Sequence, residues 1–207
     1  MENLTFISSI LFIHVLAWLT PGPLFVLIIS NSLVYSRRTG LWTALGFALG
    51  NLVHIALAVF GISLIIQSSS LIFNLTKAAG AVYLIYLGVK TILIKLETQK
   101  NSDLFNRQKD ISPFSAVKTG FTANILSTGA YFFFASIFAT ILSAKVSYWV
   151  VVFLFIAMPL NTLFMSSILS LFFTQKKVIT VYTRFQNIIN KILGIALITL
   201  AIFSIFK

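Results

Sequence analysis

The sequence contains no cysteine, which excludes a disulfide framework, a cysteine-based zinc site and a thiol nucleophile. Charged residues are also scarce, at 9% of 207 residues, against about 25% in an average soluble domain. Acidic residues are the rarer charge, with 4 Asp+Glu beside 15 Lys+Arg. With 58% hydrophobic residues and a mean hydropathy of +1.00, a soluble globule of this size could not bury its apolar surface. The composition therefore predicts an integral membrane protein.

Long apolar runs supply the segments that a bilayer requires. A spanning helix needs about 20 mostly apolar residues, and these runs are longer than the roughly ten-residue alternating segments of a membrane barrel. We therefore expect an all-α integral membrane protein with six transmembrane helices in a single transmembrane domain, residues 1–207. The predicted helices cover residues 4–30, 41–66, 71–94, 114–143, 146–173 and 186–206. The polar stretch 95–113 is predicted to be a cytoplasmic loop.

The basic residues predict the orientation, because cytoplasmic loops carry an excess of Lys and Arg. They concentrate in the first, third and fifth connections between the predicted helices. These residues are Arg37, Arg38, Lys95, Lys100, Arg107, Lys109, Lys176, Lys177 and Arg184, together with Lys118 near the start of the fourth predicted helix. The three connections are predicted to be cytoplasmic, with both termini outside. In so apolar a chain we interpret the basic residues as membrane borders, and we expect the lipid bilayer rather than nucleic acid as the partner.

A weak internal repeat divides the chain into two halves. Lys77-Ala-Ala-Gly80 in the third run aligns with Lys191-Ile-Leu-Gly194 in the sixth, and apolar residues follow each glycine in step. Three helices per half make the second half enter the membrane from the opposite side, as in many secondary transporters. We therefore predict a 3+3 inverted repeat, the alternative being a chance alignment of two helices rich in Leu and Ile.

Two segments are predicted to interrupt helices within the membrane. In Thr20-Pro21-Gly22-Pro23 two prolines remove two backbone donors and disfavour helical geometry at the residue before each. At the corresponding place in the second half, Asn124 is followed by Ser127 and Thr128 in an otherwise apolar run. Broken helices near the bilayer centre mark substrate sites in transporters. The alternatives are a kink at the first segment and interhelical hydrogen bonds at the second.

The second predicted helix combines a packing motif with two polar side chains. Gly46 and Gly50 form a G-x-x-x-G motif, which lets another helix approach closely within one chain or between two. Asn51 and His54 lie three residues apart and so on roughly one face. A buried amide or imidazole in a bilayer is costly without a partner, so both are functional candidates, although a structurally satisfied histidine is the alternative. The candidate substrate-binding residues are Thr20, Pro21, Gly22, Pro23, Asn51, His54, Asn124, Ser127 and Thr128.

At these residues the chain resembles the lysine-exporter (LysE-type) family, and within it the threonine/homoserine exporter branch. The matching segments are Thr20-Pro21-Gly22-Pro23, 36–40, 44–54, 77–90 and 114–130. The resemblance implies a compact six-helix exporter of amino acids or related small metabolites, driven by the proton-motive force. It also implies a multi-pass protein of the bacterial cytoplasmic membrane and allows a homodimer.

The chain departs from the family pattern at three polar positions. Ser127-Thr128-Gly129-Ala130 stands where family members usually carry an N-P-K-A-like motif. Asn51 replaces a common aspartate, and Asn31 replaces a common basic residue. These losses favour the alternative interpretation, a divergent non-transporting membrane component or a partner-binding protein.

The acidic residues leave the predicted spans without a carboxylate that could bind an ammonium group or relay a proton. All four acids, Glu2, Glu97, Asp103 and Asp110, fall outside those spans. His54 is therefore the titratable group expected to carry any proton coupling, since the unperturbed pKa of histidine is about 6.5.

Helix ends offer a zwitterion two further binding groups. We expect its ammonium group at the carbonyls of Ala17 and Leu19, freed by the prolines, and its carboxylate at the amides near 127–130. The absence of intramembrane acids and of a His/Asp cluster argues against a cation exporter. Paired carboxylates, a Ser-His-Asp set and a phosphate-binding loop are also missing from the spans, so we expect no enzyme, no cofactor and no metal site.

Overall fold

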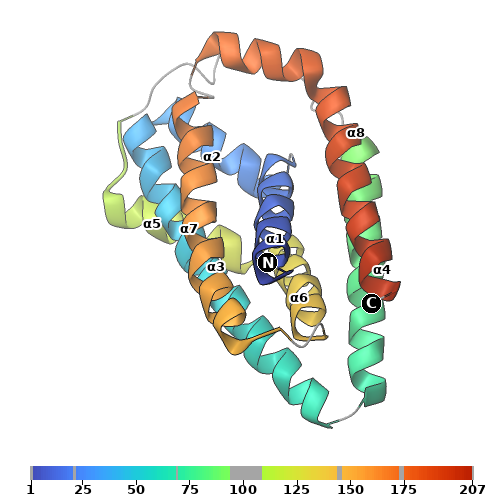
Figure 1. The fold of residues 1–207 in the computed structure, drawn as a ribbon. Helices are drawn as coiled ribbons and strands as arrows, with labels where there is room; N and C mark the ends of the chain where they lie inside the picture. Colours follow the sequence, from blue (N-terminus) through green and yellow to red (C-terminus); the bar gives the residue numbers. More distant parts are fainter. Residues whose placement is uncertain are drawn as a thin grey trace.

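The computed structural model describes residues 2–20, 22–68, 70–93, 109–143, 146–172 and 175–206. These residues form helices and no strand, which confirms the all-α prediction (Figure 1). The helices are α1 (Glu2–Leu19), α2 (Pro23–Val34), α3 (Arg37–Ser68), α4 (Ser70–Leu93), α5 (Pro113–Ile125), α6 (Thr128–Ser143), α7 (Tyr148–Phe172) and α8 (Lys176–Phe206). Of the predicted loop 95–113, residues 95–108 lie outside the described part.

The predicted helix 4–30 is two helices, α1 and α2, whose axes differ by 62°. Gly22 is the N-cap of α2 in extended geometry, with φ −151° and ψ −177°, and Pro23 occupies the first turn, where its missing N–H costs nothing. Pro21 lies outside the described residues. The expected interruption of the first helix is therefore present. A helix that continued unbroken from α1 would need a backbone N–H at residue 23, and Pro23 lacks it.

The predicted helix 114–143 is likewise two helices, α5 and α6, with an angle of 61° between them. No proline breaks it. Instead the chain ends α5 at Ile125 and restarts after Ser127, whose Oγ accepts a hydrogen bond of 3.2 Å from the Ala130 N–H. The serine hydroxyl thereby caps a helix whose first amides have no intrahelical partner.

Two other helices begin at least one helical turn earlier than the apolar runs predicted. α3 begins at Arg37 rather than 41, and α8 begins at Lys176 rather than 186. These extensions carry basic and polar residues, so hydropathy alone does not detect them. Figure 1 shows the first part of α8 running across the top of the view and its second part running beside α4.

Two of the described helices are by themselves long and apolar enough to cross a bilayer: α3 over Arg37–Gly61 and α7 over Tyr148–Phe172. The number of candidate spans rises to four when the bent pairs α1–α2 and α5–α6 each count as one span. Large apolar side chains such as Phe60 and Trp149 point outward on these helices, 69% and 76% exposed, as on a lipid-facing surface. The six-span arrangement and the 3+3 inverted repeat stay predictions.

Glycines bring α3 into backbone contact with α5. A Cβ atom on Gly46 would lie 2.2 Å from the backbone oxygen of Val117, and one on Gly120 would lie 2.3 Å from that of Thr43. Side chains larger than hydrogen are therefore excluded at the crossing. The G-x-x-x-G motif packs within the chain, so it offers no surface to the expected homodimer.

A second glycine contact joins α4 to α8, which lie side by side (Figure 1). A Cβ on Gly88 would lie 2.7 Å from the Gly194 oxygen, and one on Gly194 would lie 2.4 Å from the Gly88 oxygen. α4 also packs on α6, which connects this pair to the helices around α3. The apolar core near α6 includes the buried side chains of Phe134, Phe138 and Leu154.

Candidate functional site

The two helix breaks open on one cavity of about 730 Å³. Thr20, Gly22 and Pro23 line it from the first break, and Ser127 and Gly129 line it from the second. Its walls come from six helices, α1 to α6. A cavity of this size falls within the range of about 300–1,000 Å³ that small-molecule sites occupy. Two segments more than one hundred residues apart in the sequence thus form a single site.

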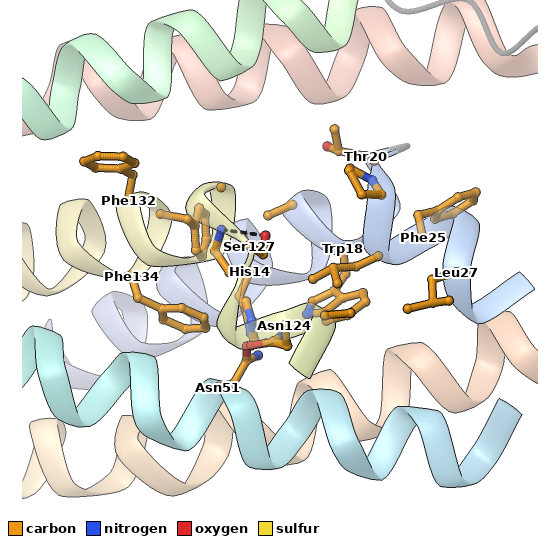
Figure 2. Close-up of a pocket in the computed structure, with 18 of the residues that line it drawn as sticks. His14, Trp18, Thr20, Phe25, Leu27, Asn51, Asn124, Ser127, Phe132 and Phe134 are labelled. Carbon is orange, nitrogen blue, oxygen red and sulfur yellow. Dashed lines mark hydrogen bonds between the residues drawn. The ribbon is translucent and has the colours of Figure 1, made fainter. Parts of the chain in front are cut away.

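Polar side chains gather on the side of the cavity formed by α1, α3 and α5. Figure 2 shows Asn51, rising from α3, beside Asn124 and His14. The Asn124 Nδ2 donates a hydrogen bond of 2.9 Å to the Asn51 Oδ1. All three residues are buried and line the cavity. We call these three residues the polar floor.

A side-chain network ties the polar floor to α7. Asn51 Nδ2 donates to the Oγ1 of Thr162, and the Trp18 Nε1 donates to the same oxygen at 3.0 Å. His14 contacts Asn161, the residue before Thr162. The Asn161 Nδ2 can only donate, so the His14 Nδ1 accepts its hydrogen bond, at 3.1 Å. One hydroxyl on α7 thereby connects α1 with α3. Such a largely buried network fixes the relative positions of the helices that carry it.

His54 supports the floor from behind rather than lining the cavity. Its Nε2 lies 2.9 Å from the backbone oxygen of Asn124, so this nitrogen carries the proton and donates. The imidazole stacks on the ring of Phe134 at 6.2 Å between centroids. Its buried Nδ1 has no hydrogen-bond partner among the described residues. The contact with the last turn of α5 makes His54 a support for the second break.

The buried oxygen Oδ1 of Asn124 also has no hydrogen-bond partner within the described part of the chain. It faces α3, where a Cβ on Gly50 would lie 2.7 Å from it. A side chain at residue 50 would therefore displace the amide that Asn51 holds. The glycine accounts for this arrangement by letting the amide oxygen lie against the helix backbone.

Most candidates named from the sequence meet at this cavity. Six of the nine line it, and His54 contacts one of these six. The six are Thr20, Gly22, Pro23, Asn51, Asn124 and Ser127. Pro21 and the side chain of Thr128 lie outside the described residues.

Four of the lining residues that were not predicted as binding residues form two pairs on α1 and α4. His14 and Trp18 lie one helical turn apart on α1, and Tyr86 and Lys90 lie one turn apart on α4. The Lys90 Nζ is 5.8 Å from the centroid of the Tyr86 ring. His14 and Trp18 lie eight and four residues before Gly22, so helical spacing from the first break could have located them. Only the packing of α4 places Lys90 here, because its sequence position resembles the end of a span.

One atom in each of the two groups expected to bind a zwitterion at the helix ends has an intramolecular partner. The carbonyl of Ala17 accepts a hydrogen bond of 3.2 Å from the Thr20 N–H, which replaces the donor that a proline at 21 lacks. The Ala130 N–H is bound by Ser127 Oγ. These two atoms are therefore engaged within the chain. The described residues also contain no group of three or more His, Cys, Asp or Glu that could hold a metal ion.

Comparison with known proteins supplies the family context. A family model described as LysE type translocator matches residues 15–207. The uncharacterized membrane protein YahN of Escherichia coli (strain K12) is 25% identical over 184 residues, which cover 88% of this chain and 81% of YahN. A leucine efflux protein of Klebsiella pneumoniae is 27% identical over 166 residues, which cover 79% of this chain and 74% of that protein. No solved structure matches the chain significantly.

Proposed function

The chain belongs to the LysE type translocator family, and from this membership we propose that it exports amino acids with apolar side chains through the cavity between the two helix breaks. Family membership makes it a multi-pass membrane transporter of small molecules rather than an enzyme. The convergence of both helix breaks on one cavity carries the proposal. Interrupted helices at a central cavity are the usual site of substrate binding in secondary transporters.

The chemistry of the cavity supports an apolar side chain on the substrate. Trp18, Phe25, Leu27 and Phe132 line it together with the polar floor (Figure 2). Such walls favour an aliphatic or aromatic group by burying its surface, at about 25 cal/mol per Å². Relatives named leucine efflux proteins make leucine the first substrate to test.

The proposed orientation places the cavity in contact with the cytoplasm. Lys90 lies in the last turn of α4, directly before the basic connection predicted to be cytoplasmic. Substrate would enter from that side, and rearrangement of the two halves about the breaks would release it outside. In this proposal both termini lie outside the bacterial cytoplasmic membrane. His54 is the residue through which the proton-motive force would be coupled in this proposal, because no acid is among the described lining residues.

Transport of labelled leucine by everted membrane vesicles tests the proposal. Vesicles from a strain that expresses the chain should accumulate leucine faster than vesicles without it, and an uncoupler should abolish the difference. A parallel growth assay with toxic analogues of amino acids and with dipeptides would identify the class of substrate by selective resistance. If neither leucine nor any analogue were moved, the alternative of a non-transporting, partner-binding membrane component would replace the exporter.

A further inference from the structure

We propose that Lys90 binds the carboxylate of the substrate, and that the cavity consequently also accepts apolar 2-hydroxy and 2-oxo acids, which lack an ammonium group. This inference rests on the proposed function, because it concerns the same cavity. It extends the class of substrate from amino acids to monocarboxylate anions with a similar side chain. The argument depends on the charges that face the cavity.

Lys90 carries the only formal charge among the described residues that line the cavity, with histidines taken as neutral. Its side chain is exposed, and no ion pair joins it to another described residue. Tyr86, which also lines the cavity, lies with its ring centroid 5.8 Å from the ammonium nitrogen. This cation–π contact holds the charge near the wall of the cavity without neutralising it.

No described lining residue is an acid, so an ammonium group in the cavity meets no carboxylate. Among the acids of the chain, Asp110 accepts a hydrogen bond of 2.8 Å from the Ser36 Oγ and is not part of the lining. A substrate carboxylate would therefore find a full opposite charge at Lys90. A substrate ammonium would find only partial charges, and Lys90 would repel it.

The helix ends at the breaks do not reverse the electrostatic preference of the cavity for a carboxylate over an ammonium group. Each break presents one C-terminal and one N-terminal helix end, worth roughly −0.5 and +0.5 elementary charge. Residues of all four ends line the cavity: Trp18 of α1, Leu24 of α2, Asn124 of α5 and Gly129 of α6. Their effects largely offset one another, so the lysine decides the sign of the electrostatic preference.

Exchange measurements on the purified full-length protein in proteoliposomes test the inference. The readout is competition against labelled leucine by two analogues that each lack one charge. 4-Methyl-2-hydroxypentanoate replaces the ammonium group by a hydroxyl, and leucinamide replaces the carboxylate by an amide. We expect the hydroxy acid to compete within about tenfold of leucine and leucinamide to compete about 10- to 100-fold more weakly than leucine, since a charged hydrogen bond contributes about 1.5–3 kcal/mol.

Three variants connect this selectivity to the lysine. Lys90→Gln should bring the hydroxy acid and leucinamide to within about threefold of each other, while Lys90→Arg should retain the preference for the carboxylate because it retains the charge. Lys118→Gln is the matched control, because Lys118 is an exposed lysine of α5 outside the cavity. An unchanged ratio in Lys90→Gln, or wild-type protein that prefers leucinamide, would overturn the inference.

A binding measurement separates this inference from the proposed function. Thermal unfolding of the detergent-purified protein with 4-methyl-2-hydroxypentanoate should show stabilisation in the wild type and none in Lys90→Gln. Stabilisation without leucine exchange would refute amino acid export and support the carboxylate site. Leucine exchange without any effect of the hydroxy acid would support export and refute the carboxylate site.

Discussion

Asn124 on α5 donates its amide hydrogen to the Asn51 Oδ1 on α3 at 2.9 Å, and Asn51 in turn donates to Thr162 on α7. Three helices are therefore joined by two consecutive amide hydrogen bonds at the wall of the cavity. Both donors are buried. The position of the second helix break depends on this connection.

Replacing Asn51 by Leu should destabilise the protein by about 1–3 kcal/mol, because it leaves the Asn124 Nδ2 without an acceptor and removes a donor to Thr162. The measurement is thermal unfolding in detergent by circular dichroism. Asn187→Leu is the matched control, since Asn187 is exposed on α8, and it should change stability little. Equal effects of the two substitutions would contradict a structural role for the amide pair.

Replacing Gly120 by Ala should separate α3 from α5 or prevent folding, because the new Cβ would lie 2.3 Å from the backbone oxygen of Thr43. Overpacking of this kind costs about 1–3 kcal/mol. Gly61→Ala provides the control, since no atom lies within 4 Å of the added carbon, and it should be neutral or stabilise α3 by up to about 1 kcal/mol. The yield of monodisperse protein and its unfolding temperature distinguish the two.

Cysteines at positions 32 and 170 should form a disulfide spontaneously. The Oγ atoms of Ser32 and Ser170 are 2.8 Å apart, so two sulfur atoms there need little movement to reach bonding distance. The chain has no other cysteine to compete. Ser32→Cys combined with Ile168→Cys is the control, because residue 168 lies about 200° around α7 from residue 170. Peptide mass mapping under oxidising conditions reports the bond; its absence from the first pair would be inconsistent with the position of α2 against α7.

Replacing Pro21 and Pro23 together by Ala should abolish export while the protein still reaches the membrane. The two substitutions restore two backbone donors, so α1 can continue through residues 20–22 and the 62° bend that directs α2 is lost. Leucine transport by vesicles, normalised to the amount of protein in the membrane, measures the effect. Pro113→Ala is the control, because Pro113 is exposed in the first turn of α5 and lies at no break. Export at the wild-type rate in the double variant would disprove the requirement for the break.

Local chemistry made the main features of the site predictable. A proline cannot donate a backbone hydrogen bond, so the interruption near Pro23 follows from the chain itself. The cluster of Asn124, Ser127 and Thr128 indicated the second break, although hydroxyl and amide residues also occur within continuous membrane helices. Hydropathy located the apolar segments, but it could not show that α3 and α8 extend into their basic flanks, because helical geometry there does not depend on apolar side chains.

The sequence by itself determined that the chain is helical and suited to a bilayer, and that its first long apolar segment is interrupted. These properties arise from composition and from backbone donors, which need no distant partner. Only the tertiary structure decided that Asn51 and Asn124 share a hydrogen bond, that both breaks line one cavity, and that Lys90 reaches it from α4. Those relationships depend on glycine contacts such as Gly46 with Val117 and Gly88 with Gly194, where whole helices approach to backbone distance. The pairing of helices far apart in the chain is a property of packing, and no local pattern encodes which partner each glycine meets.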